Sequence, residues 1–134
     1  MKKLAVLGAA AAVVYLASHS AAVTGAGGSV THNANEALAN SMAASAYGWT
    51  GSETTCLDEL WTEESGFRMV WNRAGSGAYG IPQALPASKM ASAGADYMTN
   101  PATQIRWGLG YVHDKYGTPC AAWRFETSHS PNWY

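Results

Sequence analysis

One glutamate in this chain stands where a helix usually places a core residue. Leu57, Leu60, Trp61 and Glu64 occur at positions i, i+3, i+4 and i+7. At 3.6 residues per turn these positions share one helix face, while Glu63 falls on a neighbouring face and stays in water. Burial should therefore raise the pKa of the Glu64 carboxyl. A carboxyl that remains protonated near neutral pH is what general acid catalysis requires.

The helix that carries Glu64 is predicted to begin near Thr55 and to end at Gly66, because glycine commonly terminates a helix. Helix ends also place glutamates at the rim of a core, and perturbed carboxylates occur in structural pairs. The spacing alone therefore leaves a catalytic and a structural interpretation of Glu64 open.

The remaining elements that must position this glutamate are also helical. The patterns predict a first helix capped by Asn33 and ending at Gly48, a short helix over 87–93, a long helix over 101–117 capped by Asn100, and one or two last helical turns over 119–125. The tail from Glu126 is expected to be irregular. With neither a strand pattern nor a repeat, the sequence predicts a small all-α or α-dominated domain.

The N-terminus resembles a leader. Lys2 and Lys3 precede an apolar run over 4–17 and the small residues Ser20, Ala21 and Ala22. This pattern is typical of a secretory signal peptide over 1–22, followed by a flexible Gly/Ser-rich linker over 23–32 and a folded domain over 33–134. The expected location is outside the cell or in the cell wall. The alternative is an uncleaved membrane anchor or a virion-associated protein held through 4–17.

The charge balance disfavours nucleic acid as a partner. Without Lys2 and Lys3 the chain has six basic and nine acidic side chains, and the basic ones form no stripe. Tryptophan and tyrosine are abundant instead. Such a surface suits a neutral ligand rich in hydroxyl groups, because aromatic faces stack on sugar rings.

The sequence contains two cysteines, Cys56 and Cys120. Behind a secretory leader, an even pair is most simply a disulfide. It would join the start of the Glu64 helix to the start of the last helix. The alternative is two free or metal-bound thiols, although no CxxC or ligand-spaced histidine supports a zinc site, and we expect no metal.

Three segments in this order resemble the lytic transglycosylases of the goose-lysozyme-like (SLT-like) superfamily, and most closely the small secreted actinobacterial ones. They are the Glu-Ser-Gly at 64–66, the GAYGIPQ segment at 77–83, and NPATQIRWGLGYVHDKYGTPCAAW at 100–123. The resemblance covers about residues 35–134. It implies a lysozyme-like helical domain, and it departs from the family at Glu63, where relatives often have a basic residue.

The resemblance implies cleavage of the β-1,4 bond between N-acetylmuramic acid and N-acetylglucosamine in peptidoglycan, with formation of a 1,6-anhydro ring and Glu64 as the single acid and base. Ser65 would support the glutamate and the substrate, Gln83 would bind an acetamido or hydroxyl group, and Tyr79 would line the cleft. Trp133 and Tyr134 could stack on sugars. Loop packing is the alternative role for Gln83, and core packing is the alternative for the aromatic residues.

No cofactor is implied, and we expect a monomer whose partner is a peptidoglycan glycan strand, with a membrane contact only if the leader is retained. A hydrolysing lysozyme is an alternative activity, and it would need Glu53, Glu63 or Asp96 as a base. A wall-binding or virion-associated module without activity is a second alternative. The sequence leaves both a bacterial host and a phage open as its origin.

Overall fold

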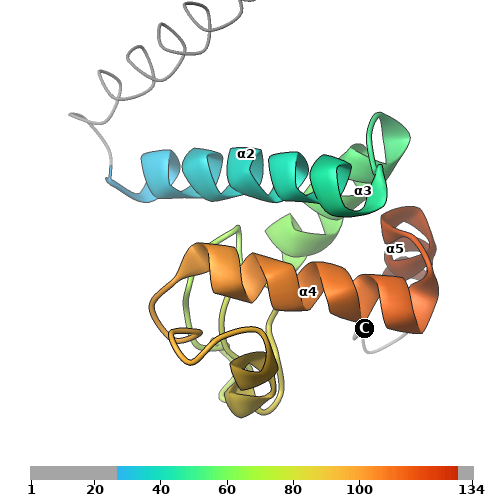
Figure 1. Cartoon of the computed structure of the whole chain (residues 1–134). Coiled ribbons are helices and arrows are strands. Elements are labelled where there is room, and N and C mark those ends of the chain that lie inside the picture. Colours follow the sequence, from blue (N-terminus) through green and yellow to red (C-terminus); the bar gives the residue numbers. More distant parts are fainter. Residues whose placement is uncertain (1–26, 130–134) are drawn as a thin grey trace, which may run out of the picture. The chain divides into compact units, whose positions relative to one another are not determined.

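The computed structural model describes residues 27–129 as helices joined by turns and loops (Figure 1). The elements are α2 (Gly27–Tyr47), α3 (Ser52–Glu64), the 3-10 helix η2 (Ala87–Ser92), α4 (Pro101–Tyr116) and α5 (Pro119–Ser128). Between 27 and 129 the only β pairing is two isolated bridges, of Tyr79 with Trp71 and with Ala84. The prediction of an all-α domain is therefore confirmed.

The chain divides into two compact units, residues 1–31 and 32–134. All the side chains discussed below belong to the second unit. The signal peptide predicted over 1–22 lies outside the described residues. Among the helices that are described, none combines the length and the apolar character needed to cross a bilayer.

Helix α2 begins earlier than the sequence predicts. Residues 27–32, which belong to the predicted linker, are helical, and Asn33 lies inside the helix instead of capping it. Contacts near this end explain the extension. Nδ1 of His32 donates to the Gly66 carbonyl at 2.7 Å, and Nε2 of the same ring is 3.2 Å from Glu36 one turn later. These contacts fasten α2 at His32 to the chain that follows α3.

Helix α3 lies between α2 and α4 (Figure 1). Asn40 of α2 donates to Asp58 of α3 at 3.3 Å, and on the other side Trp61 of α3 packs against Gly108 of α4. The helix begins at Ser52, slightly before the predicted start. Its apolar face is as predicted, since Leu57, Leu60 and Trp61 are all buried completely.

The predicted start and end of α4 are confirmed. The Asn100 side chain accepts a hydrogen bond from the Ala102 amide at 3.0 Å, Pro101 is the first helical residue, and Gly117 follows the last one. Gly108 allows close approach, because a Cβ at this position would lie 2.6 Å from the Trp61 ring. Gly110 does not have this role toward the described residues, since a Cβ there would have only the Tyr47 hydroxyl among them within 4 Å, at 3.7 Å.

Helix α5 is joined to α3 by the predicted disulfide. Cys56 and Cys120 are bonded, with 4.9 Å between their Cα atoms, and α5 packs against both α3 and α4. The prediction that the tail is irregular from Glu126 onward is wrong for residues 126–128, because α5 continues to Ser128, and residues 130–134 lie outside the described part of the chain. Pro119, Ala122 and Glu126 form its buried face, and burial of that face against α3 stabilises the additional turn.

Candidate active site

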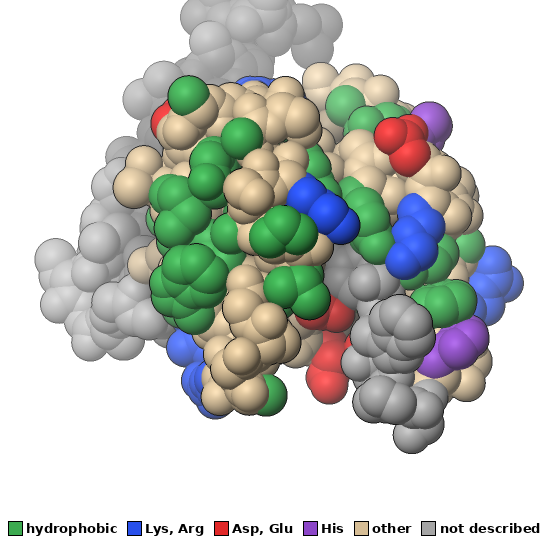
Figure 2. Space-filling model, turned by 90° about the horizontal axis from the view of Figure 1, so that it is seen from below, with side chains coloured by type: hydrophobic (Ala, Val, Ile, Leu, Met, Phe, Trp, Pro, Cys, Tyr) green, Lys and Arg blue, Asp and Glu red, His purple; other side chains and the backbone are tan. Residues whose placement is uncertain are grey.

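A cleft of about 370 Å³ opens at the C-terminal end of α3. Its walls come from the last turn of α3, from the segment that follows, and from Gln83 of the loop over 77–83, which we call the glycine loop. The lining residues are Thr62, Glu63, Glu64, Ser65, Gly66, Arg68, Val70, Trp71, Asn72, Arg73, Ala74 and Gln83. Figure 2 shows acidic side chains near the centre of one face, beside a mainly hydrophobic and uncharged surface.

Glu64 lies in this cleft as the last residue of α3. Its side chain is half-buried, whereas Glu63 beside it is exposed, as the helical spacing predicts. The pKa of Glu64 is raised to about 8, mainly because the carboxyl is buried and also because of the negative charges of Glu126 and Glu63. The carboxyl is therefore protonated near neutral pH and can donate a proton to a ligand in the cleft.

A second acidic residue, Glu126, comes from α5 and was not among the sequence candidates. Only 3% of its surface is exposed, and it is not among the residues that line the cleft. Burial raises the pKa of Glu126, and the charge of Glu63 adds to the effect. Its effect on Glu64 is thus electrostatic, without contact with the cleft.

The signal for Glu126 was present in the sequence. Pro119, Ala122 and Glu126 stand at i, i+3 and i+7, which repeats the spacing of Leu57, Leu60 and Glu64. Extending the last predicted helix by one turn would have placed Glu126 on its buried face.

Ser65 connects the end of α3 to the glycine loop over 77–83. Its hydroxyl is buried and donates to the Ile81 carbonyl at 2.7 Å. The residue lines the cleft, but this hydrogen bond directs its hydroxyl toward the loop. Ser65 therefore fixes the distance between the acid and the opposite wall.

Gln83 holds the glycine loop in shape. Its backbone has a positive φ of 52°, and its side-chain nitrogen donates to the carbonyls of Val70, at 3.0 Å, and Gly80, at 2.9 Å. Its side-chain oxygen accepts from Asn72 at 3.3 Å. Gln83 lines the cleft while these bonds fix its orientation, so any ligand would meet a preorganised amide.

Tyr79 lies behind the cleft wall. It is 7% exposed, and its hydroxyl donates to the Met98 carbonyl at 2.8 Å. Trp71 packs over it with ring centroids 4.6 Å apart, is 56% exposed and lines the cleft. The aromatic surface available to a ligand is thus Trp71, which the sequence analysis did not select, with Tyr79 as its support.

The other candidate residues lie elsewhere. Glu53 accepts a hydrogen bond from the Cys120 amide at 2.9 Å, beside the disulfide. Asp96 accepts from Thr103 and from Asn100, both at 2.7 Å, and these bonds lower its pKa. Neither carboxylate lines the cleft. Trp133 and Tyr134 lie outside the described residues.

Two arginines supply positive charge to the cleft. Arg68 donates through Nε to the Ser65 carbonyl at 3.2 Å, and Arg73 is exposed at the rim. Across residues 27–129 no group of histidine, cysteine and acidic side chains is arranged to hold a metal ion. The cleft thus combines one protonated acid, one exposed carboxylate, two cations and an aromatic face.

No model of a known protein family matches this chain, and neither a curated protein nor a solved structure is significantly similar to it. Its function is therefore inferred from the chemistry of the cleft and from the motif resemblance.

Proposed function

We propose that this protein is a peptidoglycan lytic transglycosylase with a lysozyme-like fold and with Glu64 as its acid. The observation that carries the proposal is the half-buried Glu64 in the wall of a cleft, with its pKa raised to about 8. Such a group is protonated at neutral pH and can protonate a leaving oxygen. Trp71 offers an exposed aromatic face for a sugar ring beside it.

In the proposed reaction Glu64 donates its proton to the glycosidic oxygen, and the bond from that oxygen to C1 of the muramic acid breaks. The Glu64 carboxylate then takes the proton of the 6-hydroxyl of the same sugar. The 6-oxygen attacks C1, which closes the 1,6-anhydro ring. One carboxyl group serves both steps, so water is not consumed.

The arrangement of the other carboxylates favours this reaction over hydrolysis. A hydrolase needs a second carboxylate that contacts water or the sugar. Of the three predicted bases, only Glu63 lines the cleft, since Glu53 and Asp96 are engaged elsewhere. Glu126 is close enough to influence Glu64 electrostatically, but its burial separates it from the cleft. Hydrolysis with Glu63 as the base is the second candidate.

The products of peptidoglycan digestion test the proposal. Purified peptidoglycan would be incubated with the wild type, with Glu64→Gln and with Glu59→Gln, and the ends of the released fragments identified by mass spectrometry. Glu59 is a matched control because it is an exposed glutamate of α3 outside the cleft. We expect anhydro ends from the wild type and from Glu59→Gln, and a loss of at least about 100-fold in Glu64→Gln.

Other outcomes would redirect the assignment. Reducing ends would replace the transglycosylase with a hydrolase and make Glu63→Gln the next variant. The wild type could sediment with peptidoglycan without cleaving it. The protein would then be assigned as a wall-binding module and not as an enzyme. Secretion to the cell wall belongs to the same proposal, because the substrate lies there.

A further inference from the structure

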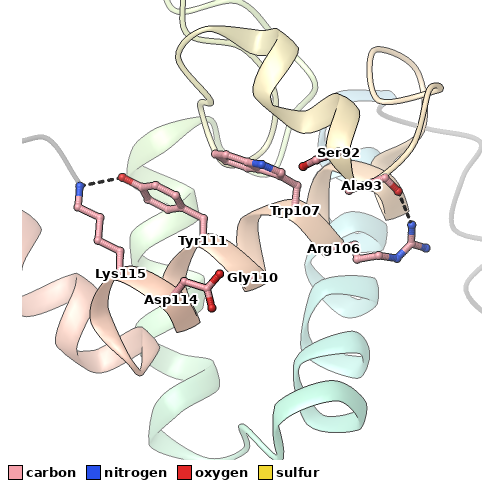
Figure 3. Close-up of a pocket in the computed structure, with 8 residues that line it drawn as sticks. All are labelled: Ser92, Ala93, Arg106, Trp107, Gly110, Tyr111, Asp114 and Lys115. Atoms are coloured by element: carbon pink, nitrogen blue, oxygen red, sulfur yellow. Dashed lines mark hydrogen bonds between the residues drawn. The ribbon is translucent and has the colours of Figure 1, made fainter.

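A second and larger hollow, of about 600 Å³, runs along the exposed side of α4 (Figure 3). Six residues of one helical stripe form its floor, and Ser92 and Ala93 at the end of η2 form a wall. We call it the α4 groove; its stripe consists of Arg106, Trp107, Gly110, Tyr111, Asp114 and Lys115.

The floor of the α4 groove is aromatic. The rings of Trp107 and Tyr111 stack with their centroids 5.2 Å apart and their planes 17° from parallel. Lys115 donates to the Tyr111 hydroxyl at 2.8 Å, and Arg106 donates to the Ala93 carbonyl at 3.1 Å, as the dashed lines in Figure 3 mark. Both cations are thus fixed, one near each end of the stripe. The groove is a pre-shaped aromatic surface with polar groups at its rim.

Gly110 lies in the middle of this stripe, and no close contact with residues 27–129 requires a glycine there. Glycine is unfavourable in a helix interior relative to alanine, so a glycine there usually makes room for a neighbour. Gly108 does so for Trp61, whereas a Cβ at Gly110 would make only one ordinary contact, with the Tyr47 hydroxyl at 3.7 Å. The missing side chain instead keeps the groove open.

The α4 groove and the cleft that holds Glu64 are linked by residues that each of them shares with a third hollow. Gln83 lines that cleft and also the third hollow, which has a volume of about 80 Å³. Trp107 and Tyr111 line the same small hollow and the α4 groove. A single extended ligand can therefore lie in the cleft, pass Gln83 and reach the stacked rings.

We propose that the α4 groove binds a further segment of the glycan strand whose scissile bond lies at Glu64. This inference rests on the proposed function. Aromatic faces stack on the apolar faces of sugar rings, while the donors Arg106 and Lys115, the acceptor Asp114 and the Ser92 hydroxyl suit hydroxyl and acetamido groups. The groove makes the enzyme select long strands over the two sugars that flank the bond.

NMR of the tryptophan indole N–H groups tests this proposal without catalysis. The full chain carrying Glu64→Gln would be titrated with peptide-free glycan strands, which an amidase prepares from peptidoglycan, and with a disaccharide fragment. We expect long strands to shift the signals of Trp71 in the cleft and Trp107 in the groove, and the disaccharide to shift Trp71 alone. The fully buried Trp61 is the internal control.

Two variants separate binding from folding. Gly110→Ala adds a methyl group to the groove floor and a better helix former to α4, so it should raise the thermal midpoint and weaken long-strand binding about tenfold. Trp107→Phe should weaken long-strand binding as well. Trp123→Phe, at a half-buried tryptophan of α5 outside both hollows, should not.

The outcomes distinguish the two proposals. A shift of the Trp71 signal without a shift of the Trp107 signal overturns the proposal for the α4 groove and leaves the proposed function intact. If strands bind only when they carry peptide stems, the occupant is the stem, and the glycan assignment fails. If neither tryptophan responds and the wild type cleaves no peptidoglycan, both proposals fall together.

Discussion

Glu64 and Glu126 belong to two helices that begin at one disulfide, and the charge of Glu126 raises the pKa of Glu64. Cys56 and Cys120 lie within the first five residues of α3 and α5, which pack against each other. Each glutamate follows its cysteine by about two turns, or roughly 9 to 12 Å of helix. The crosslink and the shared spacing therefore bring both carboxyl groups to the same end of the helix pair.

This relationship predicts that Glu126→Gln lowers the pKa of Glu64. Removing a nearby negative charge stabilises the ionised form of Glu64, so the carboxyl loses its proton at lower pH. The alkaline limb of the pH–rate profile, which lies near 8 in the wild type, should move toward neutral pH. Rates of peptidoglycan cleavage between pH 5 and 10 would measure the shift.

The cations and acids around Glu64 define the controls for that experiment. Glu63 is the other acidic group that raises the pKa of Glu64, as a smaller cause, while Arg68 and Arg73 supply positive charge to the same cleft. Glu63→Gln should move the alkaline limb in the same direction as Glu126→Gln but less far. An alkaline limb that is unchanged in Glu126→Gln would show that this residue has no electrostatic role.

The raised pKa of Glu64 also predicts that the wild type and Glu64→Gln differ in stability by an amount that depends on pH. Its pKa rises from 4.5 to about 8 on folding, so between these values the folded protein holds a proton that the unfolded chain releases. Stability from this group is complete below pH 4.5 and is lost as the pH rises toward 8. Glu64→Gln should therefore match the wild type at pH 4.5 and melt about 5 °C or more above it at pH 9.

Thermal unfolding of the two proteins at both pH values measures this difference. Glu59→Gln, at an exposed position of the same helix, is the control and should follow the wild type throughout. Parallel melting curves for Glu64→Gln and the wild type would mean that Glu64 is solvated in the folded protein.

The features that the sequence predicts well are those that neighbouring residues determine. The buried face of α3, the Asn100 cap and the glycine after α4 follow from spacing and residue type within one helix. The disulfide follows because only two cysteines exist. These local signals were sufficient to place Glu64 correctly.

The features that the sequence did not predict depend on distant partners. The early start of α2 relies on the bond from His32 to Gly66, and the last turn of α5 relies on packing of its buried face against α3. The hydrogen bonds of Gln83 depend on Val70 and Asn72, which the fold brings beside it. Such pairings cannot be derived from helical periodicity, because they join separate segments.

The disulfide predicts a measurable loss of stability on reduction. It spans 64 residues, and closing a loop of this length contributes about 4 kcal/mol in the chain-entropy model. The double variant Cys56→Ser with Cys120→Ser should be destabilised by about 2 to 5 kcal/mol in denaturant unfolding. The reduced wild type should match it, while the oxidised wild type with reductant removed should recover. Equal stability of all three would exclude a stabilising role.

The close packing at Gly108 predicts that a larger residue at this position of α4 would displace α3 near Glu64. A Cβ at Gly108 would lie 2.6 Å from Cζ2 of Trp61 and 2.8 Å from Cβ of Pro82, so Gly108→Ala forces one of them to move. Trp61 precedes Glu64 by about one turn of α3, and its displacement should lower activity as well as stability. Overpacking of this kind costs about 1 to 3 kcal/mol.

A double-mutant cycle tests whether Trp61 transmits the effect. Trp61→Phe removes the Cζ2 and Cη2 atoms that the new methyl group would meet, at the cost of a cavity. In the background of Trp61→Phe, Gly108→Ala should therefore destabilise the protein less than in the wild type, by about 1 kcal/mol or more of coupling. Additive effects would instead place the clash on Pro82 and the glycine loop, and activity would then fall through Gln83 rather than through Glu64.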